Sequence, residues 1–290
     1  MNFFVVQSVM ATDERNFSNE RAERFFSPEM MIWQVNREMA LLLAGGRALL
    51  MQLAHPKVAA GVAEHSHFKD DPLARLHRTM GAMWSIVFDK VPSARTALER
   101  VKNVHTTVQG IVKPGEPLPL GTPYDALDAN LLLWVHATLI DSAIVAYDLF
   151  VKPMTLGERS RYYEDSKKLA QLFEIPDSLM PSSLRDFNDY MEKMLAEGEI
   201  TVGPNGRSLA MEILYPPTWF LKPAGPLFRL LTAGLLPETL RKAYRLSWNE
   251  RRMKRFSLAA KGVRHTLPFV PRVLRIAPNA RRAENECTRT

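Results

Sequence analysis

The sequence predicts an all-α fold, a single large helical bundle-like domain that encloses a cofactor. Three observations lead to this prediction. Hydrophobic residues make up 46% of the 290 residues, which is enough to bury a large core. Apolar residues recur at helical spacing along most of the chain, and no convincing run alternates as a strand would. Five of the seven histidines lie between Ala54 and Gly110, and imidazole is the commonest protein ligand of metals and haem. The alternative is a helical core with ordinary hydrogen-bonded histidines.

Several classes of protein are excluded by the composition. The lone cysteine, Cys287, rules out a disulfide framework and indicates a reducing compartment, so we expect a cytoplasmic protein. There is no zinc-type Cys-x-x-Cys or His-Glu-x-x-His spacing. The apolar residues 1–6 have neither a preceding basic residue nor a following cleavage site, so they are not a signal peptide. We expect residues 1–26 to be a lead-in, 27–280 the helical domain and 281–290 a flexible tail.

The first helix is predicted to begin at Ser27-Pro28-Glu29 and to run to about Leu53. Ser27 can cap it, Pro28 suits the first turn, and Glu29 complements the positive helix end. The pair Gly45-Gly46 lets another backbone or a flat cofactor come close. Packing against a neighbouring helix and approach of a cofactor are equally compatible with this pair.

Two proline-containing steps then each begin a new helix. The His55-Pro56 step ends the first helix, and Pro56 opens a short one that runs to Glu64. Asp71-Pro72 begins another helix towards Phe88. Arg75 and Thr79 are four residues apart in it, so both project to one side and towards one site. The alternative is that Arg75 pairs with Asp71 on a solvated face.

The next helix is predicted over residues 92–110. Its apolar stripe includes His105, which therefore lies on or beside the buried face. The remaining members of the stripe are Ala94, Leu98, Val101, Val104 and Val108. A single histidine in such a stripe is more often a satisfied core residue than a ligand. Residues 113–123, rich in proline and glycine, form a loop.

A nearly all-apolar helix follows, beginning near Asp128 and covering residues 129–147. Its length approaches that of a membrane span, but it contains His136 and Asp141 and lacks basic flanks, so we expect the centre of a soluble bundle. Both polar side chains must then be hydrogen-bonded or ligating, because burying them alone costs several kcal/mol. Further helices are predicted over residues 155–173, with a Thr155/Glu158 capping box, and from Ser182 or Ser183 to Leu195.

The C-terminal part carries the basic charge of the chain. From Arg241 to Thr290 there are 14 lysines and arginines against 3 acidic residues, which leaves 24 against 28 for residues 1–240. This segment contains a basic helix around residues 241–261 and follows residues 215–240, which are apolar and broken by prolines. Together they suggest a surface that lies on a bilayer without spanning it, or that receives a long apolar substrate. Helices that close the core are the alternative. No motif for reading nucleic acid accompanies the charge, so nucleic acid is not an expected partner.

Several segments together resemble a known family. They are the blocks Trp33 to Glu38, Gly45 to Ser66, Asp71-Pro72 with Arg75-x-x-x-Thr79, His105-x-x-Val108-x-Gly110, Leu133 to Thr138, and a C-terminal part with Leu235-Leu236-Pro237, Arg241 and Trp248. These blocks are similar to the oxygenases that include latex clearing protein (rubber oxygenase) and the fungal MpaB oxygenase of mycophenolic acid biosynthesis. The resemblance covers roughly residues 30–280.

The resemblance implies an all-α fold around one b-type haem, with iron as the metal. His105 matches the proximal haem histidine of the family, and Arg75 and Thr79 match its Arg-x-x-x-Thr pair beside the haem. His136, inside another matching block, is a further candidate for cofactor binding. The chain departs from the rubber oxygenases at Arg78, where they have a lysine that can cap the distal iron. A guanidinium has no lone pair to offer iron.

The implied function is that of an oxidoreductase, an oxygenase or dioxygenase that uses O2 to cleave or oxidise a C=C bond in a small, apolar, isoprenoid-like substrate. Arg75, Thr79 and Glu64 are the candidate catalytic residues, and Glu64, His65 or His77 could move a proton. The competing prediction is a non-catalytic haem-binding or membrane-peripheral helical protein.

Overall fold

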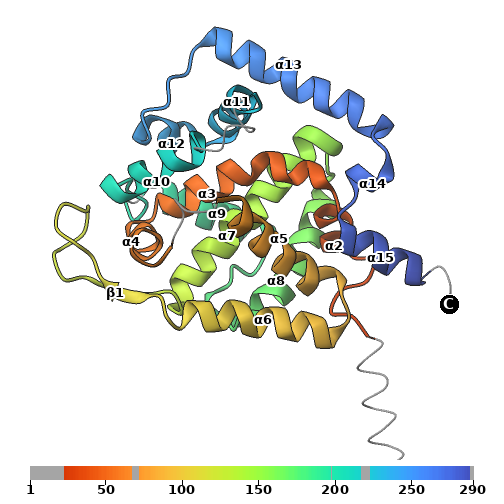
Figure 1. The fold of residues 1–290 in the computed structure, drawn as a ribbon, viewed down its shortest axis with the longest axis horizontal. Coiled ribbons are helices and arrows are strands. Elements are labelled where there is room, and N and C mark those ends of the chain that lie inside the picture. Colours follow the sequence, from red (N-terminus) through yellow and green to blue (C-terminus); the bar gives the residue numbers. More distant parts are fainter. Residues whose placement is uncertain (1–22, 67–71, 197, 217–222, 288–290) are drawn as a thin grey trace, which may run out of the picture.

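The described part of the protein is mainly helical, as the sequence predicts. The computed structural model describes residues 23–66, 72–196, 198–216 and 223–287, and for residues 72–76 the backbone alone. Helices pack around α3 (Gly45–Leu53) and α7 (Ala129–Ala146), and one small two-stranded sheet projects from the bundle (Figure 1). The all-α fold class is therefore confirmed.

The first predicted helix begins later than expected, at Met31 without a side-chain cap rather than at Ser27-Pro28-Glu29, and it is divided into three parts. Helix α2 (Met31–Asn36), the 3-10 helix η1 (Met39–Ala44) and α3 follow one another, and Glu38 between the first two is extended. Glu38 leaves the helix because its buried carboxylate accepts two hydrogen bonds from Arg275, at 2.9 and 3.0 Å, and its backbone bridges to Ile276. Gly46 packs against α11 (Gly225–Leu235), since a Cβ at this position would lie 2.1 Å from Thr232 Oγ1. Gly45-Gly46 could accommodate either a neighbouring helix or a cofactor, and the structure shows a neighbouring helix at Gly46.

The histidine-rich region forms helices α4 (Pro56–His65), α5 (Pro72–Phe88) and α6 (Val91–His105). The prediction of a helix over residues 92–110 was wrong at its end. Gln109–Ile111 instead forms strand β1, which pairs antiparallel with β2 (Pro123–Asp125). Val104 is 58% exposed and so does not belong to the buried stripe of α6. Asp71, the expected cap of α5, lies outside the described residues.

Helix α7 is the long apolar helix, capped by Asp128 through the amide of Asn130. It continues as a π turn, Tyr147–Val151. Residues 129–151 are long and apolar enough to span a membrane, but half of the apolar window is buried inside the protein, as in the core helix of a bundle. Asp141 is paired with the buried Arg47 at 2.5 Å, and His136 has the backbone of Ser166 as partner. Asp141 and His136 therefore have partners, as the sequence requires, whereas Trp134 Nε1 on the same helix is buried without a hydrogen-bond partner among the described residues.

The second half of the chain is a series of helices. Thr155 and Glu158 form the predicted capping box of α8 (Leu156–Leu172). The 3-10 turn η3 (Asp177–Leu179), α9 (Leu184–Ala196), α10 (Pro204–Leu214) and α11 follow. The basic region, predicted as one helix, is two, α12 (Glu238–Ala243) and α13 (Glu250–Thr266), separated where Arg245 adopts a positive φ of 56°. The chain ends with η5 (Leu267–Phe269), α14 (Arg272–Arg275) and α15 (Pro278–Cys287).

Helix α15 is tied to the first helices by hydrogen bonds. Glu284 accepts from Trp33 Nε1 at 3.1 Å and from Arg37 Nη1 at 3.0 Å, and it is also paired with Arg272. Ala280 and Ala283 are buried beneath it. Helical structure therefore continues to Cys287, past the boundary at residue 280 that the sequence suggested for a flexible tail.

His55 should make the fold sensitive to acid. Its Nδ1 accepts from the Lys57 amide at 3.2 Å and caps α4, and burial lowers its pKa from 6.5 to about 4. The unfolded chain binds this proton more readily, so the contribution of His55 is constant above about pH 6.5 and stability falls as the pH drops towards 4, by up to about 1.4 kcal/mol per pH unit. We expect His55→Asn, which keeps a capping side chain but does not titrate, to flatten this slope in denaturant unfolding between pH 4 and 7. An unchanged slope would contradict the assignment.

Candidate functional site

Helices α5 and α6 form an antiparallel hairpin that places the matching residues at one end. The chain reverses at Asp89-Lys90, and Asn279 on α15 holds the turn by donating to the Asp89 carboxylate. Arg75 lies 14 residues before Asp89 (89 − 75), and His105 lies 15 residues after Lys90 (105 − 90). With the same rise per residue in both helices, Arg75 and His105 are at nearly the same level. The hairpin thus brings the two motifs to the same end, although they are 30 residues apart in sequence (105 − 75).

His105 occupies the inner side of α6. It continues the stripe of Ala94, Ala97, Leu98 and Val101, of which Ala97 and Leu98 pack into the main core. The side chain of His105 is half-buried, and burial lowers its pKa. Within the described part of the chain the imidazole makes no hydrogen bond. A neutral imidazole whose ring nitrogens make no hydrogen bond to the described residues could serve as a ligand of haem iron, so His105 is compatible with the haem that the resemblance implies.

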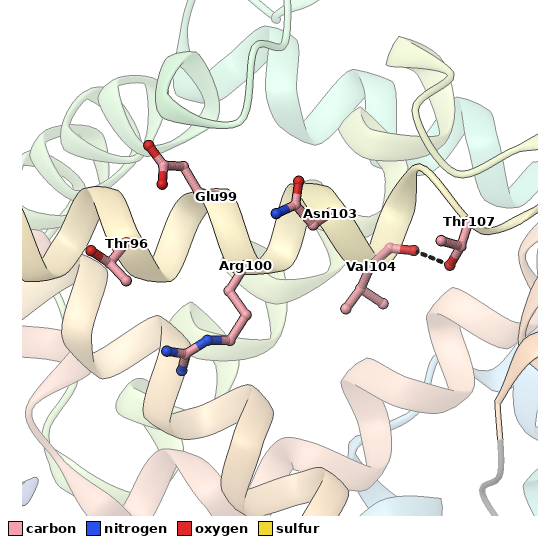
Figure 2. Close-up of a pocket in the computed structure, with 6 residues that line it drawn as sticks. All are labelled: Thr96, Glu99, Arg100, Asn103, Val104 and Thr107. Carbon is pink, nitrogen blue, oxygen red and sulfur yellow. Dashed lines mark hydrogen bonds between the residues drawn. The ribbon is translucent and has the colours of Figure 1, made fainter.

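A surface groove of about 490 Å³ runs along the other face of α6 (Figure 2). Six side chains line it: Thr96, Glu99, Arg100, Asn103, Val104 and Thr107. This volume lies in the usual range for ligand pockets. His105 is not among the lining residues, because it points to the inner side of the same helix. The groove is therefore separate from the candidate iron ligand, and we do not assign the cofactor to it.

Glu64 lies in a compact polar cluster centred on Tyr124. The buried Tyr124 hydroxyl donates to Glu64 Oε2 at 2.7 Å, and His65 Nε2 lies 3.2 Å from the same hydroxyl. Lys113 Nζ lies 2.9 Å from Glu64 Oε1. The hydrogen bonds from Lys113 and Tyr124 lower the pKa of Glu64, while burial and Glu64 raise the pKa of Tyr124. Glu64 is thus an oriented carboxylate that is ionised at neutral pH, and its lowered pKa makes it a weaker base than an unpaired glutamate.

Tyr124 also explains two glycines of the matching blocks. A Cβ on Gly110 would lie 2.6 Å from the Tyr124 hydroxyl oxygen, and a Cβ on Gly61 would lie 3.2 Å from Val108 and 3.6 Å from the Tyr124 ring. The end of α4 and the segment after His105 therefore meet around this phenol. Sequence reasoning missed Tyr124. The glycines at positions 61 and 110 were the available signal, since each marks a place where a bulky neighbour approaches the backbone.

His136 lies on α7, on a different element from His105 and Glu64. Its ring is directed to the backbone of Ser166 on α8, and burial lowers its pKa to about 4. Thr79, Arg78 and His77 are exposed on α5. The side chain of Arg75 and the proposed partner Asp71 lie outside what the structure describes, so the Arg75–Asp71 alternative does too. No cluster of three or more His, Cys, Asp or Glu side chains suited to a metal occurs among the described residues.

These features define an all-α protein with a single inward imidazole at the open end of a helical hairpin. The chain belongs to the family described as ER-bound oxygenase mpaB/B'/rubber oxygenase, catalytic domain, whose profile matches residues 33–265. It is an oxygenase-type domain. The chain is also 26% identical, over 216 residues, to two uncharacterized proteins, Mb2261 of Mycobacterium bovis and Rv2237 of Mycobacterium tuberculosis, and the match covers 72% of this chain and 81% of each relative. No solved structure matches the chain.

Proposed function

We propose that this protein is a haem-dependent oxygenase that uses O2 to cleave or oxidise a C=C bond in a small, apolar, isoprenoid-like substrate. The observation that carries the proposal is His105. It is a half-buried imidazole with a lowered pKa and no partner in the described part of the chain, in a domain of an oxygenase family.

Each candidate site residue would have its own role in the reaction. His105 holds b-type haem by its ring nitrogen, and Arg75 and Thr79 shape the haem site from α5. The haem supplies the activation of dioxygen, for which no side chain has the chemistry. Glu64, held by Tyr124 and Lys113, accepts or returns a proton. Apolar walls place the substrate, because an alkene offers no polar group to recognise.

The proposal is tested on the purified full-length chain supplied with haem. We expect a Soret band that shifts when dithionite reduces the iron, and oxygen uptake that depends on an added isoprenoid alkene. Absence of the Soret band would overturn haem dependence. A Soret band without alkene-dependent oxygen uptake, across short and long isoprenoids, would favour a haem-binding protein that lacks the chemistry.

Arg75 and Thr79 should affect the haem site more than the fold. We expect Arg75→Lys and Thr79→Val to change the haem spectrum or the rate of oxygen uptake, while the free energy of unfolding changes by no more than about 0.5 kcal/mol, as for surface substitutions. Thr79 is exposed, so its replacement leaves no cavity. Spectra and thermal unfolding of each variant provide the measurement. A large loss of stability with an unchanged spectrum would indicate that Arg75 belongs to a structural ion pair.

A further inference from the structure

The formal charge of the protein is concentrated in 26 consecutive residues. Glu250 to Arg275 contains eight arginines and lysines and one acidic residue, a net +7 (8 − 1). The whole chain has 38 basic and 31 acidic residues, also +7, so the remainder has 30 of each and is neutral. All 26 residues lie in the described part of the structure, in α13, η5, α14 and the two residues that join η5 to α14. A charge of this size on one edge creates a strong local potential for anions.

Helix α13 presents this charge outward. Phe256, Ala259, Ala260 and Val263 pack inward, and the helix runs along the edge of the molecule over α11 (Figure 1). A stripe of exposed residues follows the outer side with spacings of three and four: Arg251, Lys254, Leu258, Lys261 and His265. Among the described residues, no acidic side chain pairs with Arg251, Lys254, Arg255 or Lys261. These four cations are therefore available to an external partner.

Three exposed apolar side chains follow α13 closely in sequence, one in η5 and two in α14, and they are called the apolar cluster below. Phe269 is 86% exposed, Leu274 67% and Val273 57%. Two basic neighbours of this cluster are anchored to other segments. Arg275 donates to the Glu38 carboxylate through Nε and Nη2, and Arg272 pairs with Glu284. Three strongly exposed apolar side chains so close in sequence offer apolar surface to an interaction partner. It stands next to the cationic stripe rather than within a groove.

We propose that α13, η5 and α14 dock the protein onto an anionic lipid bilayer. The cations of α13 would lie against the lipid head groups, and Phe269, Val273 and Leu274 would enter the boundary between head groups and acyl chains. Cationic charge beside exposed apolar side chains matches the two layers of such a membrane. Nucleic acid would use the cations and leave the apolar cluster in water.

The proposed docking surface contains fewer residues than the surface that the sequence suggested. Residues 215–240 were expected to share in it, but Leu231, Ala233, Leu235 and Leu236 are buried in the core. Residues 217–222 of that stretch lie outside the described residues. The docking surface does not depend on haem or on the oxygenase reaction, so it can be tested with the protein in either state.

Co-sedimentation of the full chain with vesicles tests the proposal. We expect binding to phosphatidylcholine vesicles that contain phosphatidylserine, little binding to phosphatidylcholine alone, and loss of binding at high salt, where exposed charges are screened. Lys254→Glu/Lys261→Glu should weaken the partition coefficient at least about tenfold, from loss and reversal of two interfacial charges. Phe269→Ser/Leu274→Ser should weaken it several-fold while leaving the charge unchanged. Circular dichroism verifies that the variants fold, as expected for exposed positions.

Matched controls use the opposite side of the molecule in Figure 1. Arg95→Glu/Lys102→Glu on α6 changes the net charge equally, and Ile111→Ser/Leu120→Ser removes two comparably exposed apolar side chains from the β1–β2 hairpin. Both control variants should bind like the original protein. No binding to anionic vesicles at low salt overturns the proposal, as does an equal loss with the controls. Retention of binding in the Phe269/Leu274 variant, together with equally tight binding of duplex DNA, would overturn it in favour of a general polyanion surface.

Discussion

Replacing His105 with alanine should give a folded protein that purifies without haem. The imidazole is the candidate iron ligand, and alanine leaves the iron without a protein ligand from α6. Stability should change little, because His105 is half-buried and makes no hydrogen bond to the described residues. The loss is measured as the ratio of Soret absorbance to protein absorbance, with thermal unfolding on the same sample. We expect the ratio to fall to background, and added imidazole to restore part of it by occupying the vacated ligand position.

His136→Ala is the control for this experiment. Its ring is engaged with the backbone of Ser166 on α8, so its removal should lower stability because a buried polar group loses its partner. If the His105 variant keeps its full haem content and the His136 variant loses it, the iron ligand was assigned to the wrong residue. Loss of haem in both variants, with both still folded, would support the further role in cofactor binding that the sequence suggests for His136.

Replacing Arg47 with alanine should destabilise the fold by about 3–5 kcal/mol, the usual cost of breaking a buried ion pair. The buried guanidinium of Arg47 joins three parts of the molecule. It pairs with Asp141 at 2.5 Å, donates to Ser142 Oγ at 2.6 Å and donates to the carbonyl of Leu235 at 2.9 Å. Its loss leaves Asp141 on α7 without a counterion and opens a space between α3, α7 and α11. Urea unfolding gives the change in free energy.

An exposed ion pair provides the contrast. Lys102 and Glu174 lie 2.6 Å apart but are 50% and 69% exposed, so Lys102→Ala should cost less than about 1 kcal/mol. The double variant Arg47→Met/Asp141→Leu removes both charges and should recover much of the stability lost by Arg47→Ala, because no unpaired charge remains buried. If Arg47→Ala costs no more than Lys102→Ala, the Arg47 ion pair does not hold the helices together.

The local structure of the chain could be predicted where the decisive interaction lies within a few residues. Thr155 and Glu158 form their capping box, Asp128 caps α7, and Pro56 and Pro72 open helices at the positions expected. The all-α class followed from the spacing of apolar residues, and the family from several short blocks, and both are confirmed. The sequence also predicted that His136 and Asp141 in α7 have partners, but it did not identify those partners.

What the sequence left open depends on residues that are far apart in it. The helix is interrupted at Glu38 because this residue binds Arg275. Gly110 is needed because Tyr124 packs against its backbone, and Gly46 because Thr232 does. The assignments of His105, Arg75 and Thr79 as site residues remain predictions, since a motif gives residue types and not the group they bind.

The sequence by itself determined the helical class, the caps at Asp128 and Thr155, and the oxygenase family, because apolar periodicity and short motifs lie within single segments. Only the tertiary structure decided that His55 caps a helix and that His136 faces α8, while His105 makes no hydrogen bond to the described residues. It also decided that the cations of α13 are exposed and that Phe269, Val273 and Leu274, which follow this helix, are exposed too. The physical reason is that hydrogen-bond partners and burial are properties of packed helices, which no single segment contains.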